Sequence, residues 1–302
     1  MKGIITIFAL PQEIEDLSLT LYNLKRNSVY LDNNVKYKIE ITLSLSDKLT
    51  NWEKSSLSKN YIKERSLELC QKYLNWCEWE LSWGEDILGC VSQRRYSLRN
   101  NLDADFFIWL DCDFIFKDIT LPYMESAFIN LNKLNLQNII ITPQFVRQWD
   151  KTWDVLVNDK FINKPLMYHE NNDVFIDILS QNNDIEIEMI NDIKFAGGWF
   201  TLISKELLIK TDIPDSLGHY GLEDTFIIEC SKILNLKEKK VYQFILKNLI
   251  IGESYTQRPN ETVKKYISNI NKKNEFLDIA RNNFSNELKK FYERNNCSTN
   301  SL

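Results

Sequence analysis

Two aspartates one residue apart end an apolar run in this sequence, Phe107-Ile108-Trp109-Leu110-Asp111-Cys112-Asp113. A short apolar run with an aromatic centre predicts a buried strand, and alternation along it would direct Asp111 and Asp113 to the same side. Two carboxylates held that close repel each other unless a cation or hydrogen-bond donors offset their charge. A hard divalent ion such as Mg2+ or Mn2+ takes such oxygen ligands and often shares them with substrate phosphates. The alternative is an ordinary strand-to-loop turn, because Asp favours turns.

A glycine pair followed by tryptophan is the second candidate, in the segment Phe195-Ala196-Gly197-Gly198-Trp199-Phe200. Glycines without side chains let a ligand or another backbone come close, and the Trp199 ring offers a flat apolar face to a sugar. The simpler alternative is a turn that enters a buried strand, with Trp199 in the core.

Adjacent carboxylates end a glycine-containing loop, Gly218-His219-Tyr220-Gly221-Leu222-Glu223-Asp224. One of them could act as a general base that removes a proton from an acceptor hydroxyl, while the other binds the acceptor. Acidic residues in a first helical turn are also stabilised by the helix dipole, which is a sufficient structural reason for them.

Arg94 and Arg95, followed by Arg99, precede the Asp-x-Asp strand. The planar fork of a guanidinium suits a phosphate group. The more common use of such a run is a solvated basic helix face.

The elements that must position these residues alternate between strands and helices. We expect strands at 4–8, 39–45, 107–111, 139–141, about 194–203 and 249–251, and helices at 14–24, over most of 52–100, at 122–134, from 204 and at 223–234. This alternation predicts an α/β sandwich around a central, largely parallel sheet. Ligands of such sheets bind outside the carboxyl ends of the strands, where Asp111 and Asp113 lie. The stretch 144–194 is rich in Asn and Asp and predicts long loops.

The composition is that of a soluble globular protein, with 302 residues, 44% hydrophobic and 26% charged. A formal charge of -5 gives no global attraction to nucleic acid or to an anionic membrane. The six cysteines form neither a CxxC pair nor a zinc spacing, so we expect reduced thiols and a cytoplasmic location. The apolar stretch 4–10 is too short for a signal peptide, and nothing approaches transmembrane length.

Three motifs in one order, FIWLDCD, FAGGWFTLISKELL and GHYGLED, resemble the nucleotide-sugar-dependent glycosyltransferases of the GT-A fold, in particular inverting members of the galactosyltransferase type. The resemblance covers roughly residues 4–253. It implies a GT-A catalytic domain over 1–260, an α/β/α sandwich with a mostly parallel sheet, and a helical extension with a disordered tail over 261–302. It also implies transfer of a hexosyl group from a nucleoside-diphosphate sugar, first of all a UDP-sugar, to a hydroxyl acceptor with inversion.

The resemblance implies roles for the acidic residues. Asp113 would ligate Mn2+ or Mg2+ directly, and Asp111 would support the metal or the ribose of the nucleotide. Asp224 would be the catalytic base and Glu223 the acceptor ligand, although the two roles could be exchanged.

The resemblance also implies roles for residues around the carboxylates. Gly197, Gly198 and Trp199 would shape the pocket for the donor sugar and the acceptor. Arg94 and Arg95 would lie near the nucleotide.

The sequence departs from this family pattern at two places. His219-Tyr220 stands where galactosyltransferases have a tryptophan, so the identity of the acceptor does not carry over. Many relatives have a histidine metal ligand well after the Glu-Asp pair, but this sequence has no histidine beyond His219. Glu253, at an expected strand end, is the nearest substitute.

Two other functions are compatible with parts of the sequence. A phosphatase of the haloacid-dehalogenase type also starts its chemistry at a strand-end Asp-x-Asp, and a catalytically inactive carbohydrate-binding protein could keep the fold. For the transferase, the expected acceptor is a glycan, a lipid-linked glycan or another hydroxyl compound in glycan or polysaccharide biosynthesis, with nucleic acid the least favoured. The lysine-rich helix after 261 could lie on an anionic membrane or pack on the core with its lysines solvated.

Overall fold

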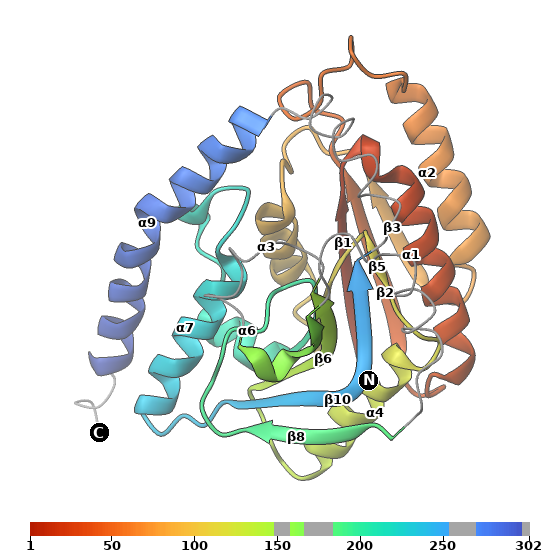
Figure 1. Ribbon diagram of the computed structural model, residues 1–302. Coiled ribbons are helices and arrows are strands. Elements are labelled where there is room, and N and C mark those ends of the chain that lie inside the picture. The colour runs from red at the N-terminus through yellow and green to blue at the C-terminus, as the bar shows by residue number, and fades with distance from the viewer. Residues whose placement is uncertain (148–157, 166–183, 254–269, 298–302) are drawn as a thin grey trace.

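A mixed sheet with helices on both faces forms the body of the protein, as the computed structural model shows (Figure 1). The structure describes residues 1–147, 158–165, 184–253 and 270–297. The strands are β1 Lys2–Ala9, β2 Lys36–Leu43, β3 Glu78–Ser82, β4 Phe106–Asp111, β5 Phe114–Ile115, β6 Ile139–Arg147, β7 Ile162–Pro165, β8 Glu186–Ile190, β9 Phe200–Ser204 and β10 Tyr242–Glu253. The helices are α1 Ile14–Asn27, α2 Lys59–Tyr73, α3 Cys90–Asn100, α4 Thr120–Lys133, α6 Lys205–Thr211, α7 Glu223–Leu236 and α9 Ile270–Cys297.

The strand order is β3-β2-β1-β4-β9-β6-β10-β5, with β7 beside β6 and β8 beside β10. The half that runs from β3 to β4 is parallel throughout, and β6 pairs in parallel with β10. Between the two halves, β9 runs antiparallel to both β4 and β6. The expectation of a largely parallel central sheet is therefore confirmed, with one reversed strand in its middle.

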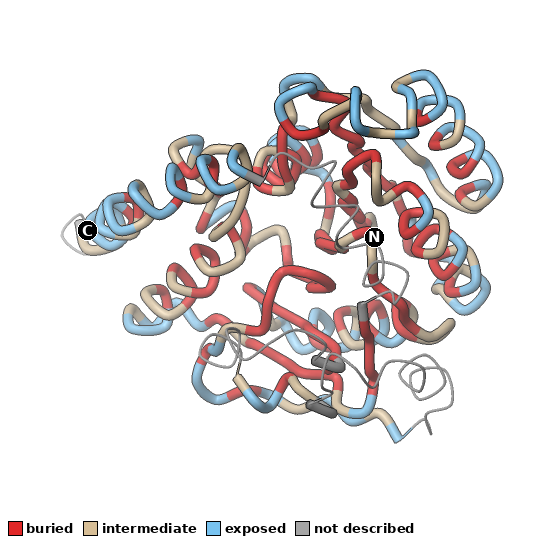
Figure 2. Tube along the Cα trace, turned by 45° about the horizontal axis from the view of Figure 1, so that its top comes forward, coloured by how far each residue is buried: buried red, intermediate tan, exposed pale blue. Residues whose placement is uncertain are grey.

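Alternation along the central strands divides the core into two layers. Ile5 of β1 and Ile108 of β4 pack toward α1, α2 and α4, whereas Ile4 and Phe107 pack toward α3, α6 and α7. Figure 2 shows the buried residues along the strands and on the inward sides of the helices. A strand covered on both faces needs apolar side chains at nearly every position, which explains why the sequence reveals β1 and β4 so clearly.

Several expected elements differ from the structure. The range 52–100 was expected to be mainly helical but also contains β3, which pairs in parallel with β2. The stretch 144–194 contains β7 and β8 among its described residues, and β10 is longer than the expected 249–251. Both β3 and β8 are only partly buried, so their sequences lack the continuous apolar pattern of an inner strand. The expected disordered tail after 297 and the expected helical turns around Val263 lie outside the described residues.

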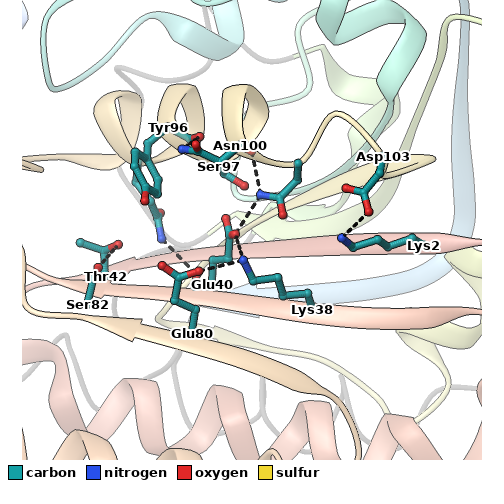
Figure 3. A network of polar contacts seen from close by, with 12 residues as sticks. Lys2, Lys38, Glu40, Thr42, Glu80, Ser82, Tyr96, Ser97, Asn100 and Asp103 are labelled. Carbon is teal, nitrogen blue, oxygen red and sulfur yellow. Dashed lines mark hydrogen bonds and ion pairs between the residues drawn. The ribbon is translucent and has the colours of Figure 1, made fainter.

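A polar network fixes α3 on the parallel half of the sheet. Gln93 Nε2 donates to backbone carbonyls of β1 and β2 at 2.7 and 3.0 Å. Asn101 at the end of the helix donates to Glu40 Oε1 at 2.8 Å, and Lys38 pairs with the same oxygen at 2.7 Å (Figure 3). Because Arg94 follows Gln93 directly, this anchoring also fixes the direction in which Arg94 leaves the helix.

The C-terminal helix α9 lies against α7 on the outside of the α3–α7 layer (Figure 1). Its Phe276, Ala280 and Phe291 are buried, and Lys272 and Lys290 pair with glutamates of the same helix. This is the packing that the core-packed alternative predicts, and membrane contact stays a prediction. In the described parts of the chain, no helix is both long and apolar enough to cross a membrane.

Candidate active site

A cavity of about 600 Å3 lies at the carboxyl ends of β1 and β4. This is the edge of the sheet at which an α/β protein is expected to bind its ligand, and the volume is in the usual range for small-molecule sites. The cavity brings together most of the residues that the sequence singles out: Arg94, Asp111, Asp113, Gly198, Trp199, Glu223 and Asp224. Loops far apart in the sequence therefore meet at one place.

The Asp-x-Asp motif forms the end of β4 and the turn into β5. The backbone N–H of Asp111 donates to the carbonyl of Trp199 at 2.9 Å. Thr20 Oγ1 donates to the carbonyls of Cys112 and Phe114, at 2.8 and 3.2 Å, and so holds the turn on both sides of Asp113. Both aspartates line the cavity, as alternation along the strand predicts.

Arg94 connects the three motifs. Its Nη1 forms an ion pair with Glu223 Oε1, and its Nη2 donates to Asp111 Oδ1 at 2.9 Å and to the carbonyl of Gly198 at 3.0 Å. The guanidinium carbon lies 4.8 Å from the centre of the Trp109 ring, which is within cation–π distance. The Arg94 side chain is 6% exposed, so these contacts offset the cost of burying its charge.

A side chain would not fit at either glycine of the pair, because each lies close to a different group. Gly197 has φ +86°, and a Cβ there would stand 2.2 Å from the Trp199 ring. A Cβ on Gly198 would stand 3.0 Å from both Arg94 Nη1 and Asp224 Cβ. Trp199 itself is buried and packs edge-on against Phe145, with ring centres 4.8 Å apart. Its ring thus belongs to the core, as the simpler alternative predicts, although the residue also lines the cavity.

The start of α7 gives its two carboxylates different environments. Leu222 adopts φ +69° just before the helix, and a left-handed residue there turns the chain sharply. Glu223 is 2% exposed and is held by Arg94. Asp224 Oδ1 accepts hydrogen bonds from the backbone N–H of Thr225 at 2.6 Å and from its hydroxyl at 3.3 Å. Within the described residues, nothing donates a hydrogen bond to Asp224 Oδ2.

The electrostatics of the cavity favour protonated carboxylates. Burial raises the pKa of Asp224 to about 7, the charge of Glu223 adds to this shift, and Arg94 opposes it. Burial also raises the pKa of Asp111 to about 6, again against the effect of Arg94. A carboxyl group with a pKa near neutrality can both take up and release a proton at physiological pH. Asp224 therefore has the protonation behaviour of a general base.

The other part of the cavity is apolar. Leu10, Leu49, Leu88 and Phe276 form a buried cluster with Tyr220 packed against it. The leucines come from loops after β1, after β2 and before α3, and Phe276 comes from α9. No local pattern in the sequence identifies these residues as site residues, because only the packing of Phe276 of α9 against the three loops brings them together.

Glu13 is a further cavity residue that the sequence motifs do not identify. It lies in the short 3-10 turn after β1, and its Oε2 accepts from the backbone N–H of Leu10 at 2.8 Å. The Cys112 thiol, in the Asp-x-Asp turn, lies 3.5 Å from the same oxygen. Pro11 followed by an acidic residue after a buried strand is the signal in the sequence that could have identified it.

Three predicted site residues lie elsewhere or are only partly described. Gly197 is absent from the cavity lining. Arg95 is absent from the cavity lining: it donates to the carbonyls of Ile213, Pro214 and Gly218 at 2.8 to 2.9 Å, and so supports the loop before α7. Glu253 ends β10, and its backbone pairs with Phe114 next to the Asp-x-Asp turn. Its side chain is outside the described set. Among described side chains, no group of three or more His, Cys, Asp or Glu residues is placed to hold a metal ion.

The architecture is the one that the motif resemblance implies. The curled, mostly parallel sheet with helices on both faces is the GT-A fold. The phosphatase alternative shares only the Asp-x-Asp motif with this sequence and does not predict this fold.

Comparison with one solved structure supports this assignment of the fold. Residues 1–349 of S. aureus TarS match with a TM-score of 0.50 and 13% identity, over 94% of this chain and 72% of that chain. The same TarS fragment in complex with UDP-GlcNAc matches with a TM-score of 0.43 and 14% identity, over 82% and 58% of the two chains. GalNAc-T7 with UDP, GalNAc and Mn2+ matches with a TM-score of 0.45 and 13% identity, over 84% and 43%. No protein-family model matches the chain, and no curated protein matches its sequence.

Proposed function

We propose that the protein is a glycosyltransferase that moves a sugar from a nucleoside-diphosphate sugar to a hydroxyl acceptor, with inversion at the anomeric carbon. The observation that carries this proposal is that Asp111 and Asp113 of the β4 end and Asp224 of the α7 start line one cavity. The cavity lies at the ligand-binding edge of a GT-A sheet. A UDP-sugar is the first donor to test.

Asp224 is the base in this proposal. Thr225 holds its Oδ1, which orients Oδ2 as the atom that takes the proton from the acceptor hydroxyl. As that proton moves to Oδ2, the acceptor oxygen forms its bond to the anomeric carbon, and the bond from this carbon to the diphosphate breaks. The diphosphate leaves with the electron pair, and attack from the opposite face inverts the configuration.

Glu223 has a different role from the acceptor ligand that the resemblance implies. Its carboxylate is paired with Arg94 in the protein interior, so a hydrogen bond to an acceptor would compete with this ion pair. In our proposal Glu223 is a positioning residue: it holds Arg94, which in turn holds Asp111 and the carbonyl of Gly198.

The residues at the β4 end fit a hard divalent ion by the chemistry of their donors. Asp113 and Asp111 supply carboxylate oxygens inside the cavity, and oxygen ligands are those that Mg2+ and Mn2+ prefer. We assign direct ligation of the ion to Asp113. Asp111 has a supporting role, because it already forms an ion pair with Arg94. Glu253 remains the proposed third ligand because its backbone lies opposite Phe114. When bound, the ion would neutralise charge on the leaving diphosphate.

The acceptor and the location are proposed more broadly. The acceptor is a glycan, a lipid-linked glycan or another hydroxyl compound. The reaction belongs to glycan or polysaccharide biosynthesis and takes place in the cytoplasm, and it is compatible with contact of the protein with a membrane surface. The absence of secretory and zinc-type cysteine patterns in the sequence supports the cytoplasmic part.

Release of nucleoside diphosphate tests the proposal even when the acceptor is unknown, because water can act as a slow acceptor in its place. The protein is incubated with a panel of nucleotide sugars in Mn2+, in Mg2+ and in a chelator, and diphosphate release is followed. We expect release from one donor class, dependent on the metal and lost in Asp224→Asn. An Asp215→Asn variant is the matched control, since Asp215 is exposed and outside the cavity. Hydrolysis of simple phosphate esters without any activity on nucleotide sugars would overturn the proposal.

A further inference from the structure

Side chains of the C-terminal helix α9 line one side of the cavity. Lys273, Leu277 and Arg281 follow one another at intervals of one helical turn, and all three line the cavity. The helix is held there by close packing: a Cβ on Gly221 would stand 2.7 Å from Leu277 Cδ1. Asn283 Nδ2 also donates to the carbonyl of Ser216 at 3.0 Å. The side chains of α9 therefore face whatever the cavity binds.

Lys273 differs from the other cations of the cavity in its partners. Arg94 is bonded to Glu223 and Asp111, and Arg281 pairs with Asp278 at 3.2 Å. Within the described residues, Lys273 has neither an ion pair nor a hydrogen bond. Its Nζ lies 5.6 Å from the centre of the Tyr220 ring. An ammonium group on a ring face in a partly apolar cavity keeps much of its capacity to bind an anion.

Tyr220 presents a hydroxyl group to the same space. The residue lines the cavity, and no described residue forms a hydrogen bond with its phenol oxygen. Burial raises the pKa of Tyr220 above its ordinary value, and the charge of Asp111 acts in the same direction. The hydroxyl therefore stays protonated and can donate to an acceptor oxygen.

We propose that Lys273 and Tyr220 bind the diphosphate of the donor nucleotide, so that the C-terminal helix completes the donor site. This inference rests on the function proposed above. Lys273 lies one helical turn from Phe276, which belongs to the apolar cluster with Leu10 and Leu49. An apolar surface for the nucleoside next to an ammonium and a hydroxyl for the phosphates matches the two halves of a nucleoside diphosphate. A phosphate or carboxylate on the acceptor has the same anionic chemistry, and the experiment separates these two sources.

Calorimetric titration with a nucleoside diphosphate and with its parent nucleoside isolates the phosphate contribution. UDP, GDP and ADP are first titrated into the wild-type protein, and the one that binds is then used with the variants. For Lys273→Ala we expect an affinity for the diphosphate about tenfold lower or weaker still, because hydrogen bonds to charged groups are the strong ones. The affinity for the parent nucleoside should stay unchanged. Tyr220→Phe should weaken diphosphate binding about threefold, and Lys273→Arg should restore most of it.

A matched control and three outcomes make the test decisive. Lys272→Ala removes the neighbouring lysine, which pairs with Glu275 outside the cavity lining, and should leave both affinities within about twofold. Equal diphosphate affinity in Lys273→Ala and wild type would overturn the inference. If that variant instead binds glycerol 3-phosphate more weakly than wild type, the pair belongs to an anionic acceptor, and the donor assignment is equally overturned. A wild-type protein that binds none of the diphosphates would overturn the proposed function itself.

Discussion

The guanidinium of Arg94 and the carboxylate of Glu223, 129 residues apart in the chain, form a buried ion pair that joins α3 to the start of α7. The two side chains are 6% and 3% exposed. Because Arg94 also donates to Asp111, this pair links the Asp-x-Asp motif to the Glu-Asp motif. It leaves Asp224, the neighbour of Glu223, as the carboxylate at the helix start that can exchange a proton with a ligand.

Replacement of the proposed base should abolish turnover and spare binding. Asp224→Asn keeps the shape of the side chain but cannot accept the proton, so we expect kcat to fall about 100- to 10,000-fold. The affinity for the donor should change little. Steady-state kinetics and calorimetry on the same preparation measure the two effects. A loss of donor affinity as large as the loss of kcat would contradict the assignment of Asp224 as base.

The stability of the Asp224→Asn protein provides a control on folding. A carboxyl whose pKa is raised by burial from 3.8 to about 7 makes the folded state less stable as pH rises through the range between these two values, and the full loss is present above pH 7. The neutral amide avoids this cost, so the variant should unfold at pH 8 at a temperature at least as high as wild type. Thermal unfolding followed by circular dichroism measures it, and a lower midpoint would show that the loss of turnover includes a structural defect.

The pH dependence of turnover should follow the ionisation of Asp224. The base must be unprotonated to act, so kcat should rise as pH increases and level off above a midpoint of about 7. With an ordinary aspartate, whose pKa is near 3.8, turnover would be flat across this range. Rates from pH 5 to 9 in a constant-ionic-strength buffer series check this. The residual activity of Asp224→Asn should lack the step, and a step that persists there belongs to another group.

Removal of the central cation should destabilise the protein strongly. Arg94→Met leaves Glu223 buried without a partner, which costs about 3 to 5 kcal/mol for a buried pair. The double variant Arg94→Met/Glu223→Leu should recover much of this loss, because both charges are then gone. Arg99→Met is the control: its side chain is 44% exposed, so we expect a loss of about 1 kcal/mol or less. Urea unfolding measures all three, and an Arg94→Met protein as stable as the control would contradict a structural role for the pair.

A single methyl group at the glycine pair should disturb the site. In Gly198→Ala the new Cβ would stand 3.0 Å from both Arg94 Nη1 and Asp224 Cβ, so these groups must shift by tenths of an ångström. We expect kcat/KM to fall about 10- to 100-fold, since small misplacements of catalytic groups are costly. Gly84→Ala is the control, because Gly84 lies outside the cavity lining. Equal activity in the two variants would show that the close approach at residue 198 is unimportant.

Loss of the direct metal ligand should mimic removal of the metal. Asp113→Ala should lower diphosphate release about 100-fold or more, and excess chelator should do the same to the wild-type protein. Added Mn2+ should restore the chelated wild type but not the variant. Asp103→Ala, at an aspartate that is 69% exposed and pairs with Lys2, should behave as wild type. Full activity of Asp113→Ala in chelator would exclude a metal-dependent reaction.

The parts of the fold that the sequence predicts well are those governed by local pattern. β1, β4 and α1 follow from apolar runs and helical spacing, because buried elements need apolar side chains at fixed intervals. β3 escaped detection since it is partly exposed and paired on only one edge. Arg95 shows what the sequence could not predict about the site. Its position beside Arg94 suggests that the two residues share a role, but its guanidinium binds backbone carbonyls of the loop before α7.

The sequence by itself determined the chemistry of the Asp-x-Asp, Gly-Gly-Trp and Glu-Asp segments and their order, because residue type, alternation and spacing are local properties. Only the tertiary structure decided how these groups divide their work. Arg94 reaches Glu223 and not Asp224, and Lys273 of α9 meets Tyr220 at the cavity. Both contacts join segments that are far apart in the chain. The residues that pack around a buried charge determine its partners and its ionisation, and the sequence alone does not show which residues these are.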